Sequence, residues 1–117
     1  MRMGIRVSEC IFCKIAGGQI KSDKVFEDKT VFAFRDVNPQ APQHVLIIPK
    51  RHVNSAAEAT KDELAAIFSA ASNIADDLKI KDSGFRMVIN QGPDAGQAVP
   101  HLHLHVLGGR PLHWPPG

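Results

Sequence analysis

The segment His101–Leu107 constrains the fold of this chain more than any other, because histidines and apolar residues alternate along it. Alternate side chains of a β-strand point to opposite faces of a sheet. The segment is therefore predicted to be a half-buried strand whose exposed face carries His101, His103 and His105. The opposite face, directed into the core, carries Leu102, Leu104 and Val106.

Three imidazoles on one face of a strand indicate a functional site. Imidazole titrates near neutral pH, binds metals, and acts as a nucleophile or proton carrier. Two simpler interpretations are a polar face formed by chance and a metal-binding tract of the kind that His-rich segments form.

Length and composition narrow the class of protein. A chain of 117 residues with 44% hydrophobic and 22% charged residues is typical of one soluble globular domain. The net charge of +2 is too small for a nucleic-acid surface or an anionic membrane partner, although small anionic ligands fit it. No apolar stretch approaches the ~20 residues that span a bilayer, and residues 1–10 lack the apolar core of a secretion signal. We therefore expect a cytoplasmic location.

The first half of the chain predicts a short helix followed by a hairpin. The helix spans Ile11–Ala16, turns Ile11, Phe12 and Ile15 inward, and ends at Gly17-Gly18. Two short strands are predicted over Lys24–Glu27 and Thr30–Arg35, joined by a tight turn.

The central part predicts a buried strand and a long helix. The strand His44–Pro49 is apolar on both faces, which favours a central position in the sheet. Thr60 and Glu63 have the spacing of a capping box, and apolar residues follow at helical intervals as far as Leu78. A further strand is predicted over Phe85–Asn90.

Two segments near the C-terminus are candidate ligand or partner contacts. The loop before the histidine strand contains Gly96-Gln97, where open backbone N–H groups suit an anion. Trp114 is the only tryptophan and lies among prolines, which suits an anchor on another surface as well as a frayed tail.

Cys10 and Cys13 form the only CxxC pair of the chain. With no other cysteines, a disulfide framework is not expected, and redox chemistry is disfavoured because no strand precedes the pair. Zinc binding is the leading interpretation, and a pair of reduced core thiols is the alternative.

Several short motifs accompany the histidine strand: Gly96-Gln97, Pro42-Gln43-His44, Pro49-Lys50-Arg51-His52, Leu107-Gly108-Gly109-Arg110 and the ending His113-Trp114-Pro115-Pro116-Gly117. With these motifs the chain resembles the histidine triad (HIT) family of nucleotide-binding proteins, and its ending is similar to the nucleoside phosphoramidase branch. The resemblance runs from Cys10 to Gly117 and implies a single domain over residues 10–117 after a flexible N-terminus over residues 1–9.

The resemblance implies an α+β fold: an antiparallel sheet of about five strands, one long helix and one short helix. It also implies a homodimer whose sheets join across the interface. The implied activity is hydrolysis of adenosine 5′-phosphoramidates and aminoacyl-AMP to AMP, with no cofactor needed for catalysis. His103 would be the nucleophile that carries the nucleotidyl group, His105 would contact the α-phosphate, and His44 would orient or assist His103.

The same resemblance implies a pocket for a purine nucleotide, in which Asp36 accepts hydrogen bonds from the ribose. The implied nucleotide-binding residues are Ile11, Phe12, Ile15, Phe34, Asp36, Val37, Leu46, Asn90, Gly96, Gln97, Ala98, His103, His105 and Trp114 of the partner subunit. A structural zinc ion would be held by Cys10, Cys13, His52 and His101.

Two positions depart from the family pattern. Pro100 stands where an aromatic residue is usual, so we expect the strand to begin one pairing later. Ala98 lacks the hydroxyl of the serine that several phosphoramidases carry there, so turnover or leaving-group preference is expected to differ. Two alternative functions are a dinucleoside polyphosphate hydrolase and a non-catalytic module for nucleotide sensing or protein interaction.

Overall fold

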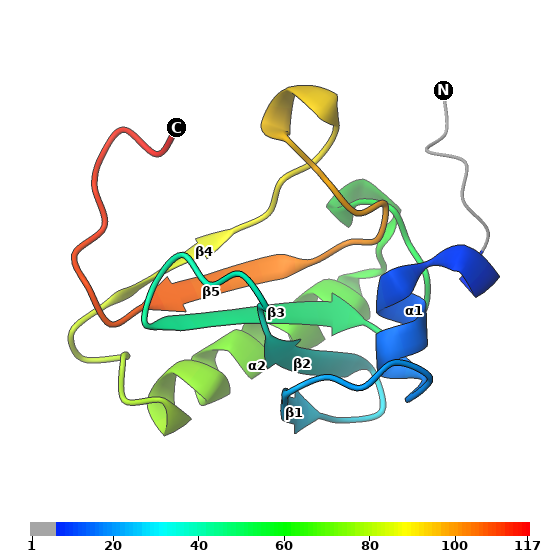
Figure 1. The fold of residues 1–117 in the computed structure, drawn as a ribbon, viewed down its shortest axis with the longest axis horizontal. Helices are drawn as coiled ribbons and strands as arrows, with labels where there is room; N and C mark the ends of the chain where they lie inside the picture. The colour runs from blue at the N-terminus through cyan, green and yellow to red at the C-terminus, as the bar shows by residue number, and fades with distance from the viewer. Residues whose placement is uncertain (1–6) are drawn as a thin grey trace.

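The chain folds into one antiparallel sheet with a helix packed on each face (Figure 1). The computed structural model describes residues 7–117. The five strands are β1 (Lys24–Glu27), β2 (Val31–Arg35), β3 (Gln43–Pro49), β4 (Phe85–Val88) and β5 (Leu104–Gly108). The helices are α1 (Ile11–Ala16) and α2 (Lys61–Asp77), and single turns of 3₁₀ helix are η1 (Val7–Glu9), η2 (Ala56–Glu58) and η3 (Pro93–Ala95). This arrangement confirms the predicted α+β class.

Strand β3 is the middle strand of the order β1-β2-β3-β5-β4. Six of its seven residues are buried, as the apolar run predicts. It pairs with β2 on one side and with β5 on the other, both antiparallel. This pairing places β3 beside the last triad histidine, with Leu46 opposite His105 and Ile47 opposite Leu104.

Helix α2 covers one face of the sheet. Its N-terminus has the predicted capping box: Glu63 N–H donates to the Thr60 hydroxyl at 3.0 Å, and Thr60 N–H donates to the Glu63 carboxylate at 2.9 Å. Its buried stripe, which includes Ile67 and Ile74, packs on Val31, Val45 and the same face of β5. This layer forms the main core.

Helix α1 covers the opposite face, where a smaller apolar cluster forms. Phe12 and Ile15 pack there with Phe34 and Leu46 from the sheet. The prediction that Ile11 faces inward is wrong, because its side chain is 47% exposed. Alternate residues of β2 thus serve different layers, one under α2 and one under α1.

The histidine segment differs from its prediction in two ways. Strand β5 begins only at Leu104, because the N–H of Leu102 donates to Val53 O at 2.7 Å instead of joining the ladder. The strand therefore begins later than predicted, because Pro100 was expected to delay its start by only one pairing. The face is also not exposed: His101 is fully buried and His103 is 6% exposed. Helix α1 lies over them, and Phe12 contacts both rings.

Other predicted boundaries shift by one or two residues. Strand β2 begins at Val31 and not at residue 30, β3 begins at Gln43, and β4 ends at Val88 and not at residue 90. Within the predicted flexible N-terminus, residues 7–9 form η1, and residues 1–6 lie outside the described part of the chain. Over the described residues, none of the helices is long and apolar enough to cross a membrane.

Candidate active site and metal cluster

A cavity of about 590 Å³ lies between α1 and the sheet. Its wall is mostly apolar and includes the imidazoles of His103 and His105. The lining residues are Ile11, Phe12, Ile15, Ile20, Lys21, Ser22, Asp23, Phe34, Arg35, Asp36, Val37, Leu46, Ala98, Val99, His103 and His105. A concave apolar site with a few polar groups is typical of small-molecule binding.

His103 is held in one tautomer by its own main chain. Its Nδ1 lies 2.7 Å from the carbonyl oxygen of His101, so Nδ1 carries the proton and donates it. Phe12 packs edge-on against the ring at a centroid separation of 5.1 Å. Nε2 therefore keeps its lone pair and has no hydrogen-bond partner among the described residues. An imidazole oriented in this way can act as a nucleophile through Nε2.

His44 contacts His105 and not His103, which corrects the predicted role of His44. Its Nδ1 accepts from the backbone N–H of Gln40 at 3.0 Å, so its proton is on Nε2. That Nε2–H donates to His105 Nδ1 at 2.9 Å. His105 must then carry its own proton on Nε2, where it is available to a ligand.

Burial keeps these two histidines neutral. Burial, together with the nearby His103 and His44, lowers the pKa of His105 to about 4, while Asp36 opposes the shift. Burial also lowers the pKa of His44, with Asp36 again opposing. His105 is consequently a neutral hydrogen-bond donor near pH 7.

Asp36 lies at the edge of the same group. Its Oδ2 is 3.5 Å from His44 Nε2, and its Oδ1 accepts from the backbone N–H of Asn38 at 2.8 Å. Asp36, His44 and His105 are close enough to form a metal site in principle. The hydrogen bond from Gln40 argues against this use, because it puts a proton on the His44 nitrogen that would have to bind the metal.

The cavity brings together ten of the fourteen residues that the family resemblance implied for nucleotide binding. Val37 belongs to the wall but its side chain is fully exposed, so it lies at the rim. Asn90, Gly96 and Gln97 do not line the cavity. The Gln97 amide instead donates to Asn54 O at 2.7 Å and to Val99 O at 3.2 Å, which holds the loop. Trp114 is 80% exposed on the tail, and its contact with a partner stays a prediction.

Sequence reasoning missed the segment 20–23, Arg35 and Val99, which also line the cavity. Arg35 N–H donates to Asp23 O at 2.9 Å, so the hairpin extends past β1 and carries residues 20–23 to the cavity. The Arg35 side chain donates to Gln43 Oε1 at 2.8 Å. The sequence signal that could have located these residues is the predicted hairpin, if its pairing is continued by one more pair, Asp23 with Arg35.

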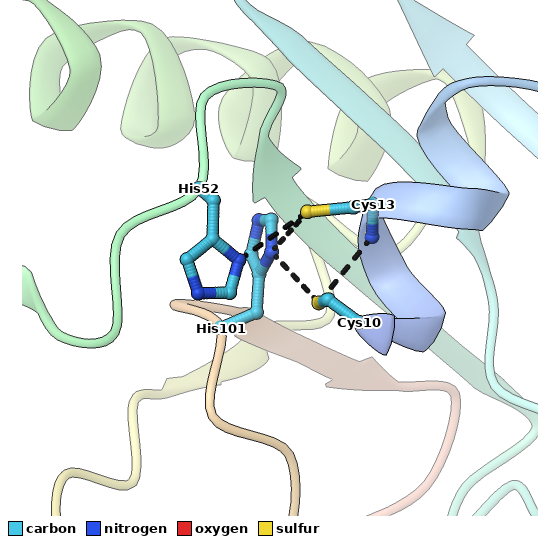
Figure 2. Close-up of side chains that lie close together, drawn as sticks. All are labelled: Cys10, Cys13, His52 and His101. Carbon is cyan, nitrogen blue, oxygen red and sulfur yellow. Dashed lines mark hydrogen bonds between the residues drawn. The ribbon is translucent and has the colours of Figure 1, made fainter. Parts of the chain in front are cut away.

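A second cluster, which Phe12 contacts through the His101 ring, consists of Cys10, Cys13, His52 and His101 (Figure 2). His52 Nδ1 lies 3.3 Å from Cys13 Sγ, and His101 Nδ1 lies 3.3 Å from Cys10 Sγ and 3.5 Å from Cys13 Sγ. Zinc bond lengths and tetrahedral angles give sulfur–nitrogen separations of about 3.6 Å. The side chains are therefore spaced as zinc ligands are.

The outer contacts of the two histidines also suit a metal. His101 Nε2–H donates to Pro49 O at 2.9 Å, and His52 Nε2–H donates to Asn54 Oδ1 at 3.2 Å. Both rings thus turn an unprotonated Nδ1 toward the sulfurs, as metal-binding histidines do. Burial and the adjacent Cys10 thiol raise the pKa of Cys13 to about 12, so a cation is needed to hold its thiolate. The cluster fits a structural zinc ion.

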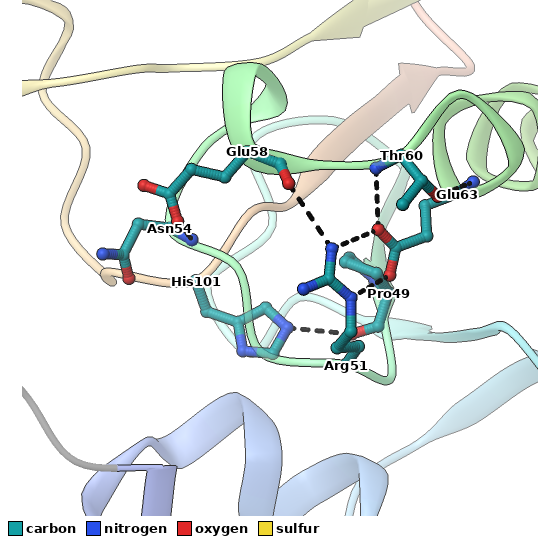
Figure 3. A network of polar contacts seen from close by, with 7 residues as sticks. All are labelled: Pro49, Arg51, Asn54, Glu58, Thr60, Glu63 and His101. Atoms are coloured by element: carbon teal, nitrogen blue, oxygen red, sulfur yellow. Dashed lines mark hydrogen bonds and ion pairs between the residues drawn. The ribbon is translucent and has the colours of Figure 1, made fainter.

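An ion pair anchors the segment that supplies His52 and Pro49 (Figure 3). Arg51 donates from Nε and Nη2 to the two carboxylate oxygens of Glu63, at 2.9 and 2.7 Å. Arg51 and the helix-capping bond of Thr60 lower the pKa of Glu63 to about 2. The same carboxylate therefore caps α2 and fixes the backbone segment that carries His52 of the cysteine–histidine cluster.

Comparison with known proteins shows which protein family this chain resembles. Residues 17–112 match the HIT domain. A 14 kDa zinc-binding protein of Zea mays is 45% identical over 115 residues, which cover 94% of this chain and 89% of that protein.

Two solved structures have the same fold. A HIT family hydrolase of Legionella pneumophila superposes with a TM-score of 0.89 at 47% identity, covering 93% of this chain and all of that chain. A histidine triad nucleotide-binding protein of Candida albicans superposes with a TM-score of 0.81 at 34% identity, covering 93% and 85%.

Proposed function

Because this chain belongs to the HIT domain family, we propose that it hydrolyses purine nucleoside 5′-phosphoramidates and aminoacyl adenylates to the nucleoside monophosphate. The reaction would pass through a nucleotidyl intermediate on His103. The observation that carries the proposal is the pair of tautomers in the cavity: an unprotonated Nε2 on His103 beside a protonated Nε2 on His105. A hydrolase and a nucleotide-binding protein among the similar structures support it.

The first step transfers the nucleotidyl group to the protein. His103 Nε2 attacks the α-phosphorus, the bond from phosphorus to the leaving amine breaks, and the amine departs with a proton taken from solvent. With an aminoacyl adenylate, the bond that breaks joins phosphorus to the carboxylate of the amino acid, which departs as the anion. Negative charge grows on the phosphoryl oxygens during this attack. His105 Nε2–H donates to that charge, which lowers the barrier because a buried donor is worth more than one in water. The ring centroids of the two histidines are 5.0 Å apart, so both rings reach one phosphoryl group.

The second step releases the product. A water molecule attacks phosphorus, the bond to His103 breaks, and the nucleoside monophosphate leaves with the imidazole restored. The water supplies an oxygen to phosphorus and a proton that replaces the one taken by the amine. Two smaller barriers thus replace a single large one.

The rest of the cavity suits a nucleoside. Phe12, Ile15 and Phe34 form an apolar wall on which a purine can rest. Asp36 reaches the cavity with a carboxylate that can accept from both ribose hydroxyls. Ala98 contributes only a backbone group and a methyl group beside the phosphoryl site, so leaving-group preference is proposed to differ from that of members with serine.

Cys10, Cys13, His52 and His101 would hold zinc, which would join the start of α1 to the segment before β5 and take no part in the reaction. The zinc-binding relative from maize supports this assignment.

We also propose a homodimer, in which Trp114 reaches the cavity of the second subunit and acts as an apolar anchor. Neither nucleic acid nor a membrane is proposed as a partner.

The test is steady-state hydrolysis of adenosine 5′-phosphoramidate, with AMP release followed by chromatography. Wild type is expected to release AMP, and His103→Ala is expected to bind AMP without turnover. Mass spectrometry of reactions that are quenched without acid should find the adenylate on His103.

Two other results would redirect the assignment. Faster cleavage of diadenosine tetraphosphate than of the phosphoramidate would favour a dinucleoside polyphosphate hydrolase. Tight AMP binding by folded wild type with no turnover of either substrate would favour the nucleotide-sensing module.

A further inference from the structure

The C-terminal tail is tied to the loop that precedes β3. Arg110 lies just after β5 and reaches back across 70 residues of sequence to Gln40. Its Nε and Nη2 both donate to the Gln40 carbonyl oxygen, at 3.2 and 2.8 Å. Its Nη1 donates to Pro111 O at 2.9 Å, which orients the guanidinium. An arginine that places two donors on one carbonyl restricts that carbonyl in direction as well as position.

Gln40 is also the residue that sets the protonation of His44. Its backbone N–H donates to His44 Nδ1 at 3.0 Å, while its side-chain amide donates to Asn38 O at 3.0 Å. The backbone of Gln40 is therefore held from both sides, by Arg110 at the carbonyl and by His44 at the N–H. Moving Gln40 would release the constraint on His44.

From Gln40 the hydrogen bonds run in one direction into the cavity. His44 Nε2–H donates to His105 Nδ1 at 2.9 Å, and His105 is left with its proton on Nε2. We call these four residues, Arg110, Gln40, His44 and His105, the tail relay. If Gln40 moved away, His44 could carry its proton on Nδ1, and His105 could turn a lone pair toward an anionic phosphoryl group instead of a donor.

We infer that Arg110 is a positioning residue for the proposed hydrolysis, because it fixes through Gln40 and His44 the tautomer in which His105 donates to the phosphoryl group. Only the expected effect of Arg110 on the rate of hydrolysis rests on the proposed function. The tautomers themselves belong to the free protein and can be measured without any substrate.

The decisive experiment is long-range proton–nitrogen NMR of ¹⁵N-labelled, zinc-supplemented protein near pH 7. The chain has only six histidines, so each ring can be assigned. Wild type should show Nε2–H tautomers for His44 and His105. Arg110→Gln should show mixed tautomers at both rings, and Arg110→Lys, which keeps the charge and a single donor group, should recover part of the wild-type pattern.

The matched control is Arg86→Gln. Among the described residues, Arg86 is a second arginine that holds the tail, through a 2.8 Å bond from Nη2 to His113 O, and its side chain does not bond to Gln40. Its replacement removes the same charge but should leave the His44 and His105 rings unchanged.

Kinetics provide the second measurement. Arg110→Gln should lower kcat roughly 10- to 100-fold, the usual cost of losing a group that orients an active-site residue, with little change in KM. Unchanged tautomers in Arg110→Gln would overturn the inference whatever the rate, and mixed tautomers with an unchanged kcat would overturn the positioning role. If wild type itself turned over no phosphoramidate, the proposed function would fail, whereas the NMR comparison would still decide whether the tail relay exists.

Discussion

Replacing Glu63 with glutamine should destabilise the protein by an amount that depends on pH in a defined way. Glu63 is 8% exposed, and Arg51 with Thr60 lowers its pKa from 4.5 to about 2. A shift of this size corresponds to about 3 kcal/mol between the two protonation states. The Arg51 side chain is 55% exposed, so solvent screens the pair and we expect about 1–2 kcal/mol at pH 7.

The sign of the pH dependence follows from the lowered pKa. A carboxylate that is more acidic in the folded protein stabilises it above the ordinary pKa of 4.5, and this contribution is lost as the pH falls toward 2. The difference in unfolding free energy between wild type and Glu63→Gln should therefore be constant above pH 5.5 or so and shrink steadily below it.

Urea denaturation followed by circular dichroism measures this difference at each pH. The matched control is Asp62→Asn, which removes a charge from the same first turn of α2 but from an exposed side chain. The control should cost no more than about 0.5 kcal/mol. A Glu63→Gln loss equal to that of the control, or one that did not change between pH 6 and pH 3, would refute the assignment of stability to the Arg51 pair.

Three further perturbations have defined outcomes. Metal analysis should find about one zinc per wild-type chain and none in the Cys10→Ser, Cys13→Ser double variant, and no zinc in wild type would support a pair of reduced thiols. Burial lowers the pKa of His105 from 6.5 to about 4, so between these pH values the unfolded chain binds more protons than the folded protein. Wild type should therefore lose stability as the pH falls from 6.5 to 4, and His105→Gln should lose less. Parallel curves of unfolding free energy against pH, measured by urea denaturation, would contradict this. Ile47→Ala in the fully buried centre of β3 should cost about 2–5 kcal/mol, whereas Val7→Ala, at a side chain that is 57% exposed, should stay within about 0.5 kcal/mol of wild type by thermal denaturation.

The predictable parts of this fold are those that local chemistry decides. The capping box at Thr60 and the helical spacing after it located α2, and the apolar run after His44 located the central strand. These signals suffice because each depends on neighbours a few residues away.

The parts that were missed depend on distant partners. The late start of β5 follows from the bond between Leu102 and Val53, which no alternation within residues 101–107 reveals. The contact of His44 with His105 likewise depends on the register between β3 and β5. Motif resemblance named ten residues that line the cavity, but it did not tell which ring nitrogens of His44, His103 and His105 face one another.

His101 divides its duties between its ring and its main chain. The ring belongs to the cysteine cluster and to Pro49, while the carbonyl oxygen alone accepts from His103. A peptide carbonyl is present whatever the side chain, so the two duties are genetically separable. If both cysteines were replaced, the carbonyl oxygen of residue 101 would still accept from His103 Nδ1, so the orientation of the His103 ring does not depend on the cysteine cluster.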